Sequence, residues 1–144
     1  MNPLRSLHES GQAVWLDFLS RRFIAEDGLK RLVQDDGLTG VTSNPSIFKK
    51  AIAGSSDYDS SLVAVIKDSD SDVMTLYETL AIADIQNAAD VLLPVYRATG
   101  RADGFVSLEV SPYLANDTQG TIAEAQRLWK AVGRENVMIK VPAT

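Results

Sequence analysis

The sequence predicts an α/β fold built around a parallel sheet, and three observations lead to this class. Four short apolar runs are separated by longer segments with helical periodicity. The two later runs, Phe105–Val110 and Val137–Val141, end at Ser111-Pro112 and Pro142, which is typical of strands that lead into loops. Strands that alternate with helices in this order are joined by right-handed crossovers into a parallel sheet.

The length and composition fit one globular unit. The chain has 144 residues, of which 45% are hydrophobic and 23% are charged, close to the average for globular proteins. We therefore expect residues 1–144 to form a single α/β unit without a second domain.

A short helix and a buried strand are expected at the start of the chain. Asn2 and Pro3 are residues preferred at the N-cap and at the first helical position, and Gly11 supplies a stop. The run Ala13–Phe18 is short and apolar, so it is a candidate strand. We expect Trp15 in this run to pack in the core.

A helix, a strand and a further helix follow. Residues 29–33 carry apolar side chains at helical spacing, and Gly37 closes that helix. Residues 40–43 form the second predicted strand. Asn44 and Pro45 then repeat the cap-then-proline signature of a helix start.

A long helical region is expected from about residue 57 to residue 98. The polar stretch 68–72 divides it in two, and Pro94 should kink or end the second helix. A turn at residues 100–104 then leads into the third strand, residues 105–110.

The last predicted helix begins at Thr118 or Thr121 and runs to about Val132, before the fourth strand at residues 137–141. The side of this helix expected to face the core comprises Ile122, Ala125, Leu128 and Trp129.

One polar side chain stands at the carboxyl end of each predicted strand. Because side chains alternate between the two faces of a sheet, an apolar set in each strand can pack under the helices. The opposite sets end in Asp17, Asn44, Glu109 and Lys140. Ligands bind at the carboxyl ends of parallel strands, and these four groups would converge if the sheet curls into a barrel.

These polar residues have two interpretations. Lys140 lies in an apolar run and should be buried, which requires partners such as Glu109 and Asp17. The group is either a buried ion-pair network or a catalytic cluster. A buried lysine amine can form a Schiff base with a carbonyl, and carboxylates move the protons that this chemistry needs. Neutralising a lysine of pKa about 10.4 at pH 7 costs about 4.6 kcal/mol, which burial can supply.

The composition excludes several other classes of protein. The chain has no cysteine and one histidine, His8, which rules out thiolate zinc sites, catalytic thiols and multi-histidine metal sites. The net charge of −5 without a basic stripe argues against nucleic-acid partners. No run is long enough to span a bilayer and no signal peptide is visible, so we expect no membrane partner and a cytoplasmic location.

Three segments together resemble transaldolase, and they occur in the order in which that family carries them. They are Gly40–Phe48, Val106–Val110 and Met138–Thr144, while Trp15–Asp17 and Leu114–Thr118 add to the match. The resemblance covers essentially the whole chain. It is greatest to the longer bacterial transaldolases, some of which are fused to a glucose-6-phosphate isomerase.

The resemblance implies a (β/α)₈ TIM barrel that performs class I Schiff-base chemistry on sugar phosphates, with no cofactor and no metal. Lys140 matches the Schiff-base lysine, Asp17 the aspartate that takes a hydroxyl proton, and Glu109 the glutamate that acts through a water. Asn44 and Thr42 match substrate-binding positions. The implied reaction moves a dihydroxyacetone unit from sedoheptulose 7-phosphate or fructose 6-phosphate to an aldose phosphate, within the pentose phosphate pathway.

A full barrel takes about 250 residues, so the chain matches the N-terminal half: four strand–helix units with extra helices. We do not expect this piece to be active alone, because the residues that hold the substrate phosphate have no counterpart in it. Open edges on the first and fourth strands would favour self-association. Two rival hypotheses are a fructose-6-phosphate aldolase-type enzyme and a non-catalytic truncated remnant whose strand-end charges only stabilise the sheet.

Overall fold

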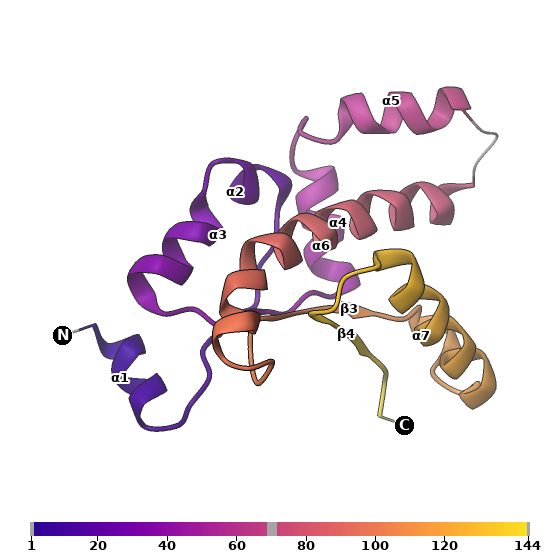
Figure 1. Cartoon of the computed structure of the whole chain (residues 1–144). Coiled ribbons are helices and arrows are strands. Elements are labelled where there is room, and N and C mark those ends of the chain that lie inside the picture. Colours follow the sequence, from indigo (N-terminus) through magenta and orange to yellow (C-terminus); the bar gives the residue numbers. More distant parts are fainter. Residues whose placement is uncertain (1, 69–71, 144) are drawn as a thin grey trace.

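The predicted α/β class is confirmed by a computed structural model that describes residues 2–68 and 72–143 (Figure 1). Its sheet consists of β1 (Trp15–Leu16), β2 (Gly40–Val41), β3 (Phe105–Glu109) and β4 (Val137–Lys140). The strands lie in chain order, and every neighbouring pair is parallel. Sequential parallel strands are the arrangement found within a (β/α)₈ barrel. β1 and β4 form the two edges of the sheet.

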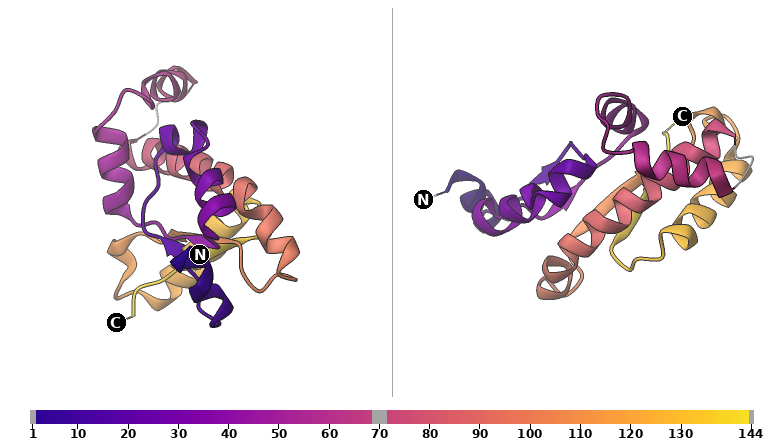
Figure 2. Two further views of the ribbon diagram at one scale, coloured as in Figure 1. Left: turned by 90° about the vertical axis from the view of Figure 1, so that its left-hand side faces the viewer. Right: turned by 90° about the horizontal axis from the view of Figure 1, so that it is seen from above.

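Helices connect and cover these strands. They are α1 (Pro3–Glu9), α2 (Arg21–Ala25), α3 (Gly28–Arg31), the π-helix η1 (Leu32–Asp36), α4 (Pro45–Ala53), α5 (Asp59–Asp68), α6 (Val73–Ala98), the 3₁₀ helix η2 (Pro112–Leu114) and α7 (Thr118–Val132). α1 lies at one end of the molecule and α7 at the other, while α5 lies on the outer side of α6 (Figures 1 and 2).

Both predicted cap-then-proline helix starts are confirmed. The Asn2 side chain accepts a hydrogen bond from the Leu4 amide at 2.9 Å, and the Asn44 side chain accepts one from the Ile47 amide at 2.9 Å. The proline that follows each asparagine lacks an amide hydrogen that the first helical turn would leave unpaired. The sequence pattern therefore fixed where α1 and α4 begin.

The long helical region ends at Ala98, as predicted. Pro94 lies inside α6, so of the two predicted effects of this proline, a kink or an end of the helix, the end is wrong. Leu92 and Tyr96 are buried on either side of Pro94, and the Tyr96 ring packs edge-on against Phe105 with centroids 5.2 Å apart. This packing compensates for the hydrogen bond that proline cannot donate. The predicted break at 68–72 falls partly outside the described residues, because residues 69–71 are not described.

The core lies between the helices and one face of the sheet. Val41, Val106 and Leu108 point into it from β2 and β3. α6 and α7 cover this face with a second set of buried residues, including Ile85, Ala88, Leu92, Leu128 and Val132.

The predicted buried side of α7 is wrong in part. Trp129 is 53% exposed and Ile122 is 47% exposed, whereas Leu128 and Val132 are buried. Leu128 and Val132 are four residues apart and form one stripe along the helix. Trp129 follows Leu128 directly, so its side chain is turned about 100° away from that stripe.

Trp15 is half-buried over the open face of β2 rather than in the main core. Its indole donates a hydrogen bond to the Asp103 carboxylate at 3.1 Å. A Cβ at Gly40 would come within 2.3 Å of this ring, so the bare backbone of β2 provides the space for the indole.

Candidate functional site

Lys140 ends β4, and its amine reaches toward the two neighbouring strands. The register pairs Lys140 with Glu109 of β3, and their Nζ and Oε2 atoms lie 3.2 Å apart. The same amine donates to the carbonyl oxygen of Ser43 at 3.0 Å and to Thr42 Oγ1 at 3.4 Å. Three acceptors from β3 and from the end of β2 therefore surround one amine at the carboxyl edge of the sheet.

A series of hydrogen-bonded hydroxyl groups lies next to this amine. Ser107 Oγ donates to Thr42 Oγ1 at 3.2 Å and accepts from the Ser43 amide at 3.3 Å. Ser43 Oγ donates in turn to the Ser107 carbonyl at 2.6 Å. Both serines are buried, with exposures of 0% for Ser43 and 3% for Ser107. The hydrogen bonds of these two serines therefore link the end of β2 to β3 close to Lys140.

These two serines were not among the predicted site residues. Strand alternation does place Ser107 on the same face as Glu109, so period-two reasoning could have included it. Ser43 has the opposite parity to Thr42. Its role depends on hydrogen bonds to the backbone and side chain of Ser107, which the alternation pattern does not encode.

Asp17 lies on the same face of the sheet as Lys140, as predicted, but at a distance from it. The Thr42 amide donates to the Leu16 carbonyl at 2.9 Å, which brings Asp17 level with Thr42 across the edge of the sheet. Within residues 2–68 and 72–143, the exposed Asp17 side chain forms no ion pair, so the predicted partnership with Lys140 is wrong here. Two strands separate β1 from β4, which puts them about 14 Å apart at the usual strand spacing.

Asn44 is also placed at the end of its strand. Its side-chain oxygen is the N-cap of α4, and within residues 2–68 and 72–143 its amide nitrogen donates no hydrogen bond. The structure thus brings Lys140, Glu109 and Thr42 into contact, whereas among the described residues Asn44 and Asp17 form no hydrogen bond or ion pair with Lys140.

The predicted burial of Lys140 is wrong. Its side chain is 41% exposed and that of Glu109 is 27% exposed. Met138, on the same face of β4, is 42% exposed as well, because the covering helices pack on the other face. An ion pair this open to water contributes about 0–1 kcal/mol to the stability of the fold. The same exposure leaves the Lys140 amine accessible from solvent.

A cavity of about 280 Å³ adjoins Glu109 at the carboxyl end of β3. Its largely apolar wall includes Tyr77, Ala81, Ile82, Leu108, Val110 and Leu128. Burial, and secondly the negative charge of Glu109, raise the pKa of the Tyr77 phenol above its ordinary value. The negative charge of Glu109 therefore interacts both with the Lys140 amine and with the Tyr77 phenol in this cavity.

The described part of the chain contains no group of three or more histidine, aspartate or glutamate side chains arranged to hold a metal ion. Among the helices that the structure describes, none combines the length and the apolar character needed to cross a membrane.

Comparison with known proteins places this arrangement in a family. The family model described as transaldolase/fructose-6-phosphate aldolase matches residues 14–144. "Transaldolase 2" of Nostoc punctiforme is 47% identical over 99% of this chain, and "Transaldolase" of Neisseria meningitidis is 49% identical over 100%. These matches cover 37% and 40% of the two relatives, so the chain spans about two fifths of their length. By its sequence, and with the parallel sheet that carries Lys140, the chain belongs to the transaldolase/fructose-6-phosphate aldolase family.

Proposed function

We propose that the full-length protein containing this chain is a transaldolase, which transfers a dihydroxyacetone unit from a ketose phosphate to an aldose phosphate. The observation that carries the proposal is the Lys140 amine, held at the carboxyl end of β4 by Glu109, Ser43 and Thr42. Relatives named transaldolase that are similar over the whole of this chain support it. The reaction would belong to the pentose phosphate pathway in the cytoplasm.

In this mechanism the neutral Lys140 amine adds to the keto carbon of the substrate. The resulting carbinolamine loses its oxygen as water, with Glu109 supplying the proton through a bridging water, and a Schiff base remains. Asp17 then takes the proton of the hydroxyl on the second carbon from the Schiff-base carbon. The bond between the first and second of these carbons breaks, and the second carbon leaves as the carbonyl of an aldose phosphate. The electron pair of that bond moves toward the Schiff-base nitrogen and leaves an enamine on Lys140, which adds to the carbonyl of the acceptor aldose by the reverse steps.

The positions of Asn44 and Thr42 suit substrate binding. The half-buried Thr42 hydroxyl contacts the amine, and Asn44 lies two residues further along the same segment, so both could bind hydroxyl groups of the sugar. The partial exposure of Lys140 leaves this face open to a ligand.

The chain accounts for only part of such a site. We propose that residues 1–144 are the N-terminal part of a TIM barrel, with the substrate phosphate held by the remainder, because the chain spans 37–40% of the relatives' length. In the full-length protein the sheet would curl further, which would bring Asp17 toward Lys140.

Reductive trapping tests this proposal. The full-length protein is incubated with fructose 6-phosphate and sodium borohydride, and the adduct is mapped by peptide mass spectrometry. We expect a dihydroxyacetone-derived adduct on Lys140 and none on Lys140→Met. Trapping with unchanged efficiency in Lys140→Met, or no adduct on the correctly folded wild-type protein, would contradict the proposal, and the second result would favour a non-catalytic role.

The family description names a second candidate activity, fructose-6-phosphate aldolase. Both activities trap the same adduct, so the acceptor distinguishes them. A transaldolase releases little product from fructose 6-phosphate until an acceptor such as erythrose 4-phosphate is added, whereas an aldolase releases free dihydroxyacetone without one.

A further inference from the structure

We propose that Ser43 and Ser107 are positioning residues: their hydrogen bonds hold the segment that follows β2 against β3, and this segment in turn holds the Lys140 amine. The inference rests on the proposed function and deepens it, because the rate at which an amine attacks a carbonyl depends on how precisely the amine is held. The two hydroxyls act through the backbone of Ser43 and through Thr42.

The segment that holds the amine lies beyond the regular strand. β2 ends at Val41, which pairs with Val106 of β3. The two groups of this segment that accept hydrogen bonds from Lys140 come after that point, at Thr42 and Ser43. β3 lies between them and β4, which carries the lysine. On the side of β3, bonds other than the regular strand pairing therefore have to hold this piece of chain.

Two serine hydroxyls supply these bonds. The Ser43 amide donates to Ser107 Oγ at 3.3 Å, and Ser43 Oγ donates to the Ser107 carbonyl at 2.6 Å. In a parallel sheet the amides and carbonyls of neighbouring strands bond to one another directly, so here each hydroxyl takes the place of one backbone partner. Both serines are buried. Without its hydroxyl partner, each of these backbone groups would be left unpaired away from water, which is costly.

This serine pair fixes two of the three acceptors around the amine. The Ser43 carbonyl, which accepts from Lys140 Nζ at 3.0 Å, belongs to the residue that both bonds hold. Thr42 Oγ1 lies 3.4 Å from Nζ and accepts from Ser107 Oγ at 3.2 Å. The third acceptor, Glu109, lies on β3 opposite Lys140 and depends on strand pairing. Loss of either serine hydroxyl should therefore loosen the amine on the side of β2 and leave its pair with Glu109 intact.

The rate of Schiff-base formation measures how well the amine is positioned. The full-length protein is mixed with fructose 6-phosphate at a series of concentrations and quenched with sodium borohydride at successive times, and the adduct on the Lys140 peptide is quantified by mass spectrometry. We expect Ser43→Ala and Ser107→Ala each to lower the maximal rate by about threefold to tenfold, the range of one hydrogen bond. Because both hydroxyls hold the same segment, the double variant should lose less than the product of the two single effects.

Thr39→Val is the matched control at the other end of the same strand. Thr39 is buried immediately before β2, and its hydroxyl donates to the Val14 carbonyl at 3.3 Å. Loss of this bond should lower the urea midpoint, as loss of a serine hydroxyl does, but should leave the maximal rate of Schiff-base formation unchanged. Where Ser107→Ala does not fold, Ser107→Cys provides the same comparison, since a thiol is a weak donor.

Three results would overturn the inference. They are serine variants that keep the wild-type maximal rate, serine variants that change only the half-saturating concentration of substrate, and a Thr39→Val variant that slows the reaction equally. Full multiplication of the two single effects would show that the serines act separately and would also contradict it. No adduct on the wild-type protein would overturn the proposed function as well, so failure of that function is distinguished from failure of this inference alone.

Discussion

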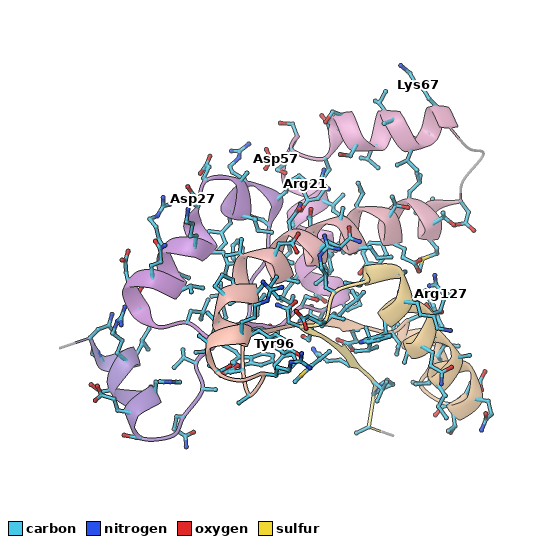
Figure 3. The ribbon with its side chains drawn as sticks, in the orientation of Figure 1. Arg21, Asp27, Asp57, Lys67, Tyr96 and Arg127 are labelled. Carbon is cyan, nitrogen blue, oxygen red and sulfur yellow. The ribbon has the colours of Figure 1, made fainter. Side chains whose placement is uncertain are left out.

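At the scale of single residues, the buried charge of Asp84 is the feature with the greatest expected effect on stability. Asp84 lies within α6 with 0% exposure and accepts hydrogen bonds from Arg21 Nε at 2.9 Å and from the Tyr58 hydroxyl at 2.7 Å. The Arg21 guanidinium stacks 4.4 Å from the centre of the Tyr58 ring and also donates to Ser61. Arg21 lies at the start of α2, close to Asp57 (Figure 3). One carboxylate thus connects three segments that are distant in sequence.

Asp84→Ala should lower the free energy of unfolding by about 3–5 kcal/mol, because it leaves the Arg21 guanidinium and the Tyr58 hydroxyl without their partner. Urea denaturation followed by circular dichroism measures the loss. Asp90→Ala is the control on the same helix: it removes an exposed pair with Arg134 and should cost about 0–1 kcal/mol. Equal losses in the two variants would contradict the role of burial.

Tyr58 also predicts how stability changes at alkaline pH. Burial, followed by the neighbouring Asp84 carboxylate, raises the pKa of the Tyr58 phenol well above its ordinary value. The folded state therefore retains this proton where the unfolded chain releases it. The associated stability is complete below about pH 10 and is lost as the pH rises further. Urea midpoints between pH 8 and pH 11 should fall less steeply in Tyr58→Phe than in the wild type, and parallel curves would exclude this source.

At the scale of elements, the turn between α6 and β3 depends on one glycine. Gly104 has φ +89°, and a Cβ at this position would come within 2.2 Å of the Tyr96 backbone nitrogen. The adjacent Asn136 side chain, fully buried, donates to the carbonyls of Gly104 and Ala89 at 2.9 and 2.8 Å. The start of the third strand is therefore fixed by close backbone packing.

Gly104→Ala and Gly100→Ala form a matched pair, because both glycines have positive φ but nothing lies within 4 Å of a Cβ at Gly100. Gly100→Ala should cost about 1–2 kcal/mol, the strain of a left-handed residue. Gly104→Ala should cost clearly more, since α6 has to move as well. Thermal denaturation of the two variants measures the difference, and equal melting temperatures would refute the close packing.

The helices also show what sequence periodicity could and could not predict. Asn2 and Asn44 mark helix starts through local hydrogen bonds, so the sequence was sufficient there. The side of α7 that is buried depends on where β3 and β4 lie, and the apolar residues of α7 cover more than one side. Asp84 was missed because an acidic residue within a helix is ordinarily solvated, and its partners are 26 and 63 residues away.

α7 provides a direct test of the observed burial. Leu128→Ala should lower the free energy of unfolding by about 2–5 kcal/mol, the usual range for a buried leucine. Trp129→Ala should change it by about 1 kcal/mol or less, because half of this side chain is exposed. Denaturation midpoints of the two variants are compared under one set of conditions. A larger loss for Trp129→Ala would reverse the assignment of the two faces.

At the scale of the whole molecule, the sheet has an open face and two open edges. The parallel order was predictable from the alternation of strands and helices, whereas the distance from Asp17 to Lys140 was not. That distance depends on the curvature of the complete sheet, which four strands alone do not determine. The contact between Glu109 and Lys140 requires only neighbouring strands, so strand alternation was enough to suggest it.

The open edges predict self-association of the chain of residues 1–144. Unpaired edge strands act as templates for further pairing, and Met138 exposes an apolar side chain on β4. Sedimentation velocity should show an average mass that rises with concentration, and Met138→Lys should reduce this rise. Met74→Lys, at a somewhat more exposed position on α6, should not. A monomer at all concentrations would contradict this prediction.

The contact between Thr42 and Lys140 spans 98 positions of the chain, and this has a consequence for synthesis. β2 and β3 are synthesised before β4, so the hydroxyl groups of Thr42, Ser43 and Ser107 are present before the Lys140 amine. Until β4 docks beside β3, the Lys140 amine lacks its contacts with Glu109, Ser43 and Thr42. The hydrogen bonds and the ion pair around the Lys140 amine therefore form only once the fourth strand is in place.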